Sequence, residues 1–367
     1  MLKINGKSIV GWGIAALVVA GIIGTNMYQE KGSNPDSKKV VYAFYPLTGT
    51  VANLGKEAQK YTQIWEKLHP EAPFQIKFID SESKPDRAVS ALNQILLKEK
   101  DPIVISLFSF IGKATIPIIE KTDGFIFAPA TIISMGEGVT HYQRIGSSIS
   151  DALTPLVNYI QPAQKVAIIN LDDEYGVLNS TYFKDEILKK GAHLTIQETL
   201  RFRDLDVRIS VYKVLETKPD IVYVTGTASM AYSNIFKELS VQEFKGIVLA
   251  DNAFQNKSNL ENIAGINLHM FAAIPPMDGF KTNYPQAVEE IQNANMELYY
   301  LPAEIFDTFN LINYTFKNNL PFTQETYTKM GQWKGVIGDM ILPGNGDSLY
   351  PFIMVQYKNG KFVSVTE

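Results

Sequence analysis

The chain contains 367 residues, of which 46% are hydrophobic and 20% are charged. This length exceeds what one ordinary core needs, and the composition is that of a globular protein, so we expect two domains. The formal net charge of −4 gives no electrostatic reason to expect a nucleic-acid partner. The sequence has no cysteine, which excludes disulfides, cysteine-ligated metal centres, thiol nucleophiles and a lipid-anchored cysteine. The four histidines are scattered singly, so a histidine-based metal site is not expected.

Residues 1–28 are predicted to be an export signal. Lys3 and Lys7 precede the uncharged run Ile9–Gly24, whose length lies between that of a cleaved signal and that of a membrane span. The segment is therefore a signal peptide or an uncleaved anchor in the inner membrane, and the poor cleavage signature favours retention. A buried helix of the first domain is the alternative. The polar residues 29–39 are predicted to be a linker, and all that follows is expected outside the cytoplasm, in the periplasm or at the cell surface.

From Val40 onward, short apolar strands alternate with amphipathic helices. The expected strands are Val40–Tyr45, Phe74–Ile79, Ile103–Phe108, Phe125–Ala128, Val166–Asn170, Leu194–Thr199, Ile221–Thr225 and Ile247–Ala250. Continuous apolar strands separated by such helices indicate parallel sheets covered on both faces. Two consecutive runs predict an α/β fold of two doubly wound, Rossmann-like lobes. Later in the chain we expect a helix over Ala303–Phe316 and a hairpin that turns at Asn359-Gly360.

Chemistry in such folds is expected just after each strand, at the carboxyl edge of the sheet. No GxGxxG, GxxxxGK[ST] or GxSxG motif is present. The strand-end loops instead contain small hydroxyl residues, glycine and aromatics, in the segments Thr48–Gly55, Phe108–Gly112, Ala128–Thr131, Asp172–Gly176, Thr225–Ser229 and Ala250–Phe254. Backbone N–H groups at helix starts together with hydroxyls suit a carboxylate, and no nucleophile–base pair accompanies them. We interpret these segments as binding loops.

The order of motifs resembles that of the periplasmic substrate-binding proteins of the branched-chain-amino-acid type, which have the class I periplasmic-binding-protein fold. The family's opening, P-L-[ST]-G-x-x-A-x-x-G after a strand, matches Pro46–Gly55 at each point. The spacing from Asp80 to Pro85, the segment Ala128–Thr131 and the ending from Gly335 to Phe362 follow in order. The resemblance covers about Lys39 to Phe362.

The resemblance implies two lobes joined by three crossovers, with the ligand clamped between them. We assign residues 40–148 and 277–332 to lobe 1 and residues 149–276 and 333–367 to lobe 2. The crossovers are expected near Ser147–Asp151, Ile274–Met277 and Gly331–Gly335, where the alternation of strands and helices changes lobe.

The family's ligand contacts carry over to eight positions. Ser109, Ala130 and Thr131 would hold the carboxylate of the ligand. Tyr175 and Thr227, with Ala228 beside it, would approach from the second lobe. The acidic residue that recognises an ammonium aligns with Asn252, while Asp251 lies one position earlier, so the carboxylate half of the site is better kept than the amine half.

Each assignment has a structural alternative. Ser109 can cap the helix that follows its strand, Ala130 and Thr131 can be turn residues, and Tyr175 can pack on its own lobe. The acidic run Asp172–Glu174 resembles a metal cluster but is typical of a helix N-terminus, so no metal and no cofactor is expected.

The sequence therefore predicts an extracytoplasmic, non-enzymatic protein that binds a small, amino-acid-like or carboxylate-bearing ligand. Its membrane partner would be an ABC permease or the receptor of a signalling system. An exported hydrolase and a scaffold that reuses the fold are the alternatives. In the scaffold, Tyr45, Phe108 and Phe110 would fill the cleft.

Overall fold

The computed structural model describes residues 38–129, 133–136, 138–227, 229–255, 257–358 and 360–365. The predicted signal segment 1–28 and all but the end of the predicted linker 29–39 lie outside the described residues. Within those ranges, no helix is long and apolar enough to cross a membrane.

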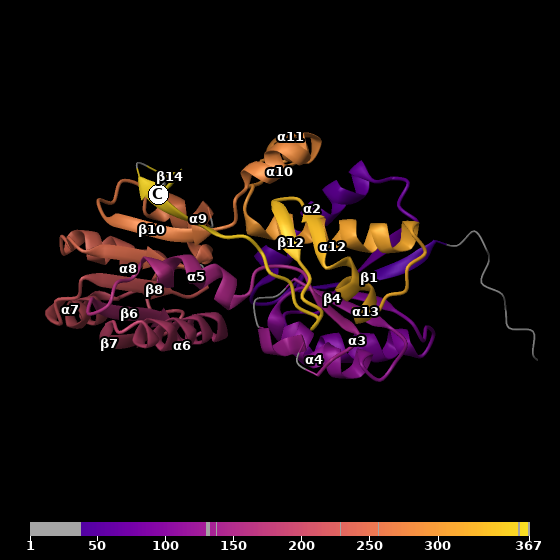
Figure 1. The fold of residues 1–367 in the computed structure, drawn as a ribbon, viewed down its shortest axis with the longest axis horizontal. Coiled ribbons are helices and arrows are strands. Elements are labelled where there is room, and N and C mark those ends of the chain that lie inside the picture. The colour runs from indigo at the N-terminus through magenta and orange to yellow at the C-terminus, as the bar shows by residue number, and fades with distance from the viewer. Residues whose placement is uncertain are drawn as a thin grey trace, which may run out of the picture. The chain divides into compact units, whose positions relative to one another are not determined.

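Five strands form the first sheet, in the order β2-β1-β3-β4-β5 (Figure 1). Their bounds are β1 Lys39–Tyr45, β2 Phe74–Asp80, β3 Ile103–Ser106, β4 Phe125–Ala128 and β5 Tyr142–Arg144. The pairs β1–β3, β3–β4 and β4–β5 are parallel, and every residue of β3 and β4 is buried. Burial on both faces explains why these strands read as continuous apolar runs rather than alternating ones.

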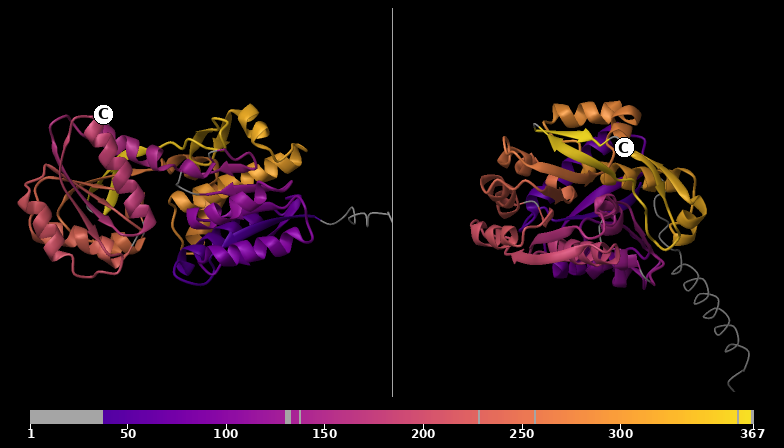
Figure 2. Two further views of the ribbon diagram at one scale, coloured as in Figure 1. Left: turned by 90° about the horizontal axis from the view of Figure 1, so that it is seen from below. Right: turned by 60° about the vertical axis from the view of Figure 1, so that its left-hand side comes forward.

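Helices from both ends of the described chain cover this sheet. They are α2 Ala52–Leu68, α3 Pro85–Leu96, α4 Ser109–Ile119, α10 Asp278–Asn283, α11 Pro285–Asn293, α12 Tyr300–Lys317 and α13 Gln324–Met330. Figures 1 and 2 show α12, coloured orange-yellow, beside the indigo α2. The Trp65 indole donates a hydrogen bond to Asn310 Oδ1 at 2.8 Å across this contact. Helix α12 thus completes a core that the first hundred residues begin.

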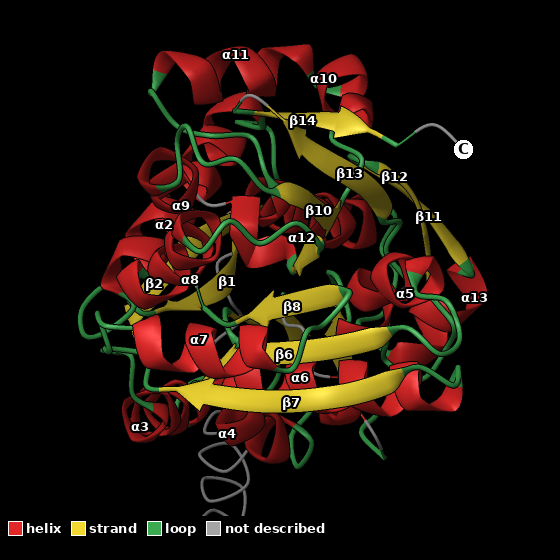
Figure 3. Cartoon of the chain, turned by 90° about the vertical axis from the view of Figure 1, so that its left-hand side faces the viewer, coloured by secondary structure: helices red, strands yellow, loops and turns green. Residues whose placement is uncertain are grey.

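Seven strands form the second sheet, in the order β14-β13-β10-β9-β8-β6-β7 (Figure 3). They are β6 Lys165–Leu171, β7 His193–Leu200, β8 Ile221–Thr225, β9 Ile247–Ala250, β10 His269–Ile274, β13 Ile353–Lys358 and β14 Lys361–Ser364. The α-helices of this part are α5 Ile149–Tyr159, α6 Glu174–Lys189, α7 Arg208–Glu216, α8 Met230–Val241 and α9 Lys257–Asn262. Strands β6 to β10 pair in parallel, and β13 and β14 add an antiparallel edge. The predicted α/β fold and its hairpin of β13 and β14 are confirmed, whereas the sequence analysis did not identify β10.

The chain passes from one sheet to the other three times. It enters the second sheet through α5, returns after β10, and crosses again between β12 and β13. The small hairpin of β11 (Gln332–Gly335) and β12 (Gly338–Ile341) stands apart from the second sheet. Its residues Val336 and Met340 pack in the same core as Phe309 of α12. The third crossing therefore falls between Ile341 and Ile353, later than the expected Gly331–Gly335, because these apolar side chains stay with the first core.

Two glycines explain the motif that opens the first sheet. Gly49 has φ +90°, a backbone conformation that side chains disfavour. A Cβ on Gly55 would lie 2.1 Å from the carbonyl oxygen of Pro46, so the first turn of α2 packs directly on the turn after β1. These glycines hold the start of α2 at the carboxyl end of the sheet.

Candidate functional site

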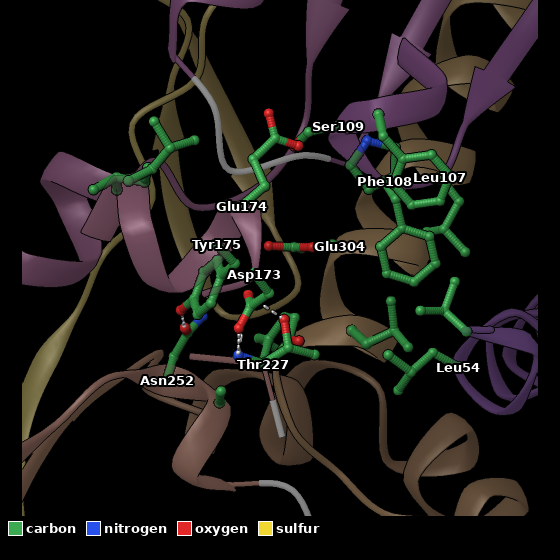
Figure 4. A pocket seen from close by; sticks show the side chains of 18 residues that line it. Leu54, Leu107, Phe108, Ser109, Asp173, Glu174, Tyr175, Thr227, Asn252 and Glu304 are labelled. Atoms are coloured by element: carbon green, nitrogen blue, oxygen red, sulfur yellow. Dashed lines mark hydrogen bonds between the residues drawn. The ribbon is translucent and has the colours of Figure 1, made fainter. Parts of the chain in front are cut away.

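A cavity of about 290 Å³ lies where strand-end loops of the two sheets meet (Figure 4). Its volume is at the small end of the range for ligand pockets in proteins, roughly 300–1,000 Å³. Eighteen residues line it: Val51, Leu54, Leu107, Phe108, Ser109, Phe110, Pro129, Ile149, Asp173, Glu174, Tyr175, Leu178, Thr227, Asn252, Ala253, Tyr300, Leu301 and Glu304. Most follow the carboxyl ends of β1, β3, β4, β6, β8 and β9, which is where ligands bind in open parallel sheets.

Ser109 lines the pocket as the first residue of α4, which begins three residues after β3 ends. The N-cap is Phe108, which offers no side-chain hydrogen bond, so Ser109 is not the helix cap that the alternative interpretation supposed. The first intrahelical bond runs from Gly112 N to Phe108 O. The N–H groups of the first turn therefore need partners other than the helix itself. Phe108 has φ +74°, a strained conformation for a bulky residue of the kind found at functional sites.

Two aromatic side chains form part of the wall. The rings of Phe108 and Phe110 stack with centroids 6.0 Å apart and an interplanar angle of 5°. Both line the pocket without closing it. Tyr45 is fully buried in the first core, where its hydroxyl lies 2.9 Å from Thr62 Oγ1. The three aromatic residues of the scaffold alternative thus leave a cavity.

The second sheet contributes two hydrogen-bonded pairs. The Tyr175 hydroxyl donates to Asn252 Oδ1, and the Thr227 hydroxyl donates to Asp173 Oδ1 at 2.9 Å. Burial raises the pKa of Tyr175 well above its usual value, and the nearby Asp251 adds to the effect. Tyr175 is therefore a neutral hydrogen-bonding group. All four side chains of these pairs face the pocket, including three of the predicted positions.

Asp251 is absent from the pocket lining. Its side chain is 1% exposed and accepts hydrogen bonds from the hydroxyls of Thr225 and Tyr232 and from the backbone N–H groups of Gly226 and Ala253. Burial raises its pKa to about 7. The carboxylate thus braces the loops behind the wall, and its neighbour Asn252 takes the position on the pocket.

Two predicted positions, Ala130 and Thr131, lie outside the described residues, as does Ala228. The adjacent Pro129 lines the pocket. The sequence analysis missed the residues from the start of α12, which are Tyr300, Leu301 and Glu304. They follow no strand, and the only sequence signal for Glu304 is an acidic residue within an apolar helical segment.

The first part of the chain matches a known family. Residues 41–267 match the family model described as periplasmic binding protein, which is more than half of the chain. The chain belongs to the periplasmic binding protein family. No curated protein matches the sequence.

Solved structures agree with this membership at the level of the fold. A leucine binding protein from Thermotoga maritima shares 18% identity over 89% of this chain and 98% of that one, with a TM-score of 0.72. A branched-chain amino acid transporter substrate binding protein from Streptococcus pneumoniae, solved with isoleucine, shares 18% identity over 89% of this chain and 98% of that one, and its TM-score is 0.71. A solute binding protein of an ABC transporter from R. palustris, solved with benzoate, shares 14% identity over 90% of this chain and 95% of that one, and its TM-score is 0.72. The recognised family and the predicted fold class are thereby confirmed, and the family implies an extracytoplasmic binding role.

An ion pair lies at the rim of the pocket of this periplasmic binding protein. Glu174 at the start of α6 pairs with Lys113 of α4 at 2.5 Å, and both side chains are about half exposed. Since α4 covers the first sheet and α6 the second, this ion pair connects the two lobes.

The acidic run before α6 has a structural role. Asp173 is the N-cap of α6 and accepts a hydrogen bond from Gly176 N at 3.1 Å, while Asp172 accepts one from Phe202 N at 2.7 Å. Within the described residues, no three metal-ligating side chains come together. The described residues that line the pocket include no histidine, and its wall combines hydrogen-bonding groups with apolar side chains.

Proposed function

We propose that the protein captures a small solute in the pocket of Figure 4 by closing its two lobes, and presents the closed form to a membrane partner such as an ABC permease. The observation that carries this proposal is a cavity whose lining comes from strand-end loops of both sheets. Closure excludes water, so the few polar groups of the wall bind more strongly in a lower dielectric. A ligand that touches both lobes binds the closed state more tightly than the open state, and this difference in affinity stabilises the closed state. A sensor module of a signalling system is the alternative partner.

The start of α4 is the proposed site for an anionic end of the ligand. Ser109 lines the pocket at this helix start, the N–H groups of the first turn have no partner within the helix, and the helix dipole favours negative charge there. Ala130 and Thr131 complete this subsite in the proposal. Tyr175, Thr227 and Asn252 then set selectivity from the second lobe.

The solved neighbours guide the choice of compounds. Their titles name isoleucine in one complex and benzoate in another. The lining of this pocket combines stacked phenylalanines with aliphatic side chains, which suits a ligand with an apolar body. Branched amino acids and aromatic acids are therefore the first compounds to test.

The experiment is a thermal-shift or native mass-spectrometry screen against amino acids, amides and organic acids, followed by calorimetry. We expect Ser109→Ala to weaken an anionic ligand about tenfold to a hundredfold, because one charge-assisted hydrogen bond contributes about 1.5–3 kcal/mol. Ser210→Ala on α7, away from the pocket, is the matched control. A screen without hits would contradict the proposed function, and unchanged affinity in Ser109→Ala would place the anionic end elsewhere.

A further inference from the structure

Glu304 is a buried carboxylate on the pocket wall. It lies near the start of α12 and is 5% exposed. Both of its hydrogen bonds come from Ser147, whose backbone N–H and hydroxyl donate to Oε1 at 3.1 Å. Among the described residues none donates to Oε2, and Figure 4 shows the carboxylate extending into the middle of the pocket.

The nearby cations are engaged elsewhere. The Arg144 guanidinium pairs with Asp347 and donates to the carbonyl oxygens of Gly146 and Ser348. It lies close enough to lower the pKa of Glu304, but burial dominates and raises that pKa to about 7. Lys113, at the rim, pairs with Glu174. Glu304 therefore has no ion-pair partner among the described residues.

The described wall as a whole carries only negative side-chain charge. It contains Asp173, Glu174 and Glu304 but no lysine, arginine or histidine. Asp173 accepts hydrogen bonds from Gly176 and Thr227, and Glu174 forms an ion pair with Lys113. A buried carboxylate is costly unless it is paired, so Glu304 is the acidic group that gains most from a bound cation.

We propose that Glu304 recognises a protonated amine or guanidinium of the ligand, while the apolar body of the ligand lies against Phe108 and Phe110. This inference rests on the proposed function and adds the charge of the ligand to it. With an anionic end at Ser109, the ligand is a zwitterion with an apolar middle. The amine contact thereby moves from the predicted positions Asp251 and Asn252 to a helix of the first lobe, since the Asp251 carboxylate already accepts four hydrogen bonds.

The test uses three probes that share a phenyl ring. L-Phenylalanine carries both charges, phenethylamine only the cation and 3-phenylpropanoate only the anion. Calorimetry compares them on the wild type, on Glu304→Gln and on Asp251→Asn, each checked for folding by thermal unfolding. Glutamine keeps an oxygen that can accept from Ser147, so Glu304→Gln removes the charge with little change in shape.

We expect Glu304→Gln to weaken both amines about tenfold to a hundredfold and to leave 3-phenylpropanoate unchanged or tighter. Asp251→Asn should change the affinities of all three probes by a similar factor, because this carboxylate holds loops of the second lobe and faces no charge of the ligand. The inference is overturned if Glu304→Gln leaves the affinities of the two amines unchanged, or if it weakens 3-phenylpropanoate as much as it weakens phenethylamine.

If none of the three binds, the hit from the screen is compared with its N-acetylated form. A hit without a cationic nitrogen overturns the inference and leaves the proposed function standing. A hit that loses affinity on acetylation in the wild type but not in Glu304→Gln supports it. A screen without any hit contradicts both.

Discussion

Three buried carboxyl groups among the described residues have raised pKa values, and each has a different structural context. Glu304 faces the pocket, Asp251 braces the loops behind it, and Asp307 lies inside the first core. Burial raises the pKa of each to about 7. The Asp307 carboxylate accepts hydrogen bonds from Val336 N at 2.8 Å and from the Tyr350 hydroxyl. It fastens the small hairpin of β11 and β12 to α12.

The raised pKa of Asp307 makes stability depend on pH. In the unfolded chain its pKa is close to 3.8, so between pH 4 and pH 7 the folded state binds more protons. The contribution of Asp307 to the free energy of unfolding is thus fully present below about pH 4 and is lost as pH rises to about 7. Asparagine does not titrate, and one pKa unit corresponds to about 1.4 kcal/mol.

We therefore compare the free energies of unfolding of Asp307→Asn and the wild type by urea unfolding. As the pH rises from about 4.5 to about 7.5, this free energy should change in favour of the variant by at least about 1.4 kcal/mol. Glu290→Gln, on the exposed pair with Lys67, serves as the control and should show a much smaller change. A difference between the wild type and Asp307→Asn that stays constant over this range would mean that Asp307 titrates normally.

Neighbouring residues at a strand end are hard to separate from the sequence. Asp251 and Asn252 follow β9 directly, and alternation tells that they face different ways but not which one faces a ligand. Asn252 lines the pocket, whereas the Asp251 carboxylate points away from it because it accepts hydrogen bonds from the hydroxyls of Thr225 and Tyr232. Glu304 could not be predicted as a site residue for another reason. Its partner Ser147 is 157 residues away in the sequence, and only tertiary folding brings the two together.

At the scale of elements, α4 and α6 are joined by one ion pair. Lys113 and Glu174 sit at the rim of the pocket and are about half exposed. An exposed pair contributes only about 0.2–1 kcal/mol, so its effect on unfolding is small. Because the two helices belong to different lobes, the same free energy would favour the closed form in the proposed equilibrium between open and closed forms.

We expect Lys113→Ala to speed ligand dissociation by up to about fivefold while changing the free energy of unfolding by less than about 1 kcal/mol. Stopped-flow or surface plasmon resonance measures the rate. Lys189→Ala removes a pair with Glu186 inside α6 and is the matched control. In about 1 M salt the wild type should approach the variant, since exposed charges are screened. Equal rates for the two variants would argue against a connection between the lobes.

The elements that were predicted best are the buried parallel strands. Strands such as β3, β6 and β8 are mostly apolar and buried and stand between clear helices, so periodicity and length suffice to find them. Strand β10 was missed although it has the same character. The hairpin of β11 and β12 was missed because its short strands carry exposed polar residues and pack through only a few apolar side chains.

At the scale of the whole molecule, the three passages between the sheets are the proposed hinge. The first leads into α5 near the expected segment Ser147–Asp151, and the second leaves β10 near the expected segment Ile274–Met277. The third consists of the stretch between Ile341 and Ile353. The sequence predicted the number of passages through the family resemblance, and the position of the third depended on long-range packing that no local pattern reveals.

We expect small-angle scattering to show a smaller radius of gyration at saturating ligand, because closing reduces the separation of the lobes. Ser109→Ala at a ligand concentration that fills the wild type but not the variant provides the control. Its radius should remain that of the free protein. An unchanged radius in the saturated wild type would mean that the pocket fills without closure.

The antiparallel edge of the second sheet has a consequence for synthesis. In the register of β10 and β13, Met270 faces Tyr357. During translation at roughly 5–20 residues per second, β10 therefore waits on the order of 5–20 s for its partner. Throughout that interval its apolar edge is unpaired, and such an edge is a template for aggregation. A chaperone that covers a nascent chain would be needed most while β10 has left the ribosome and β13 has not.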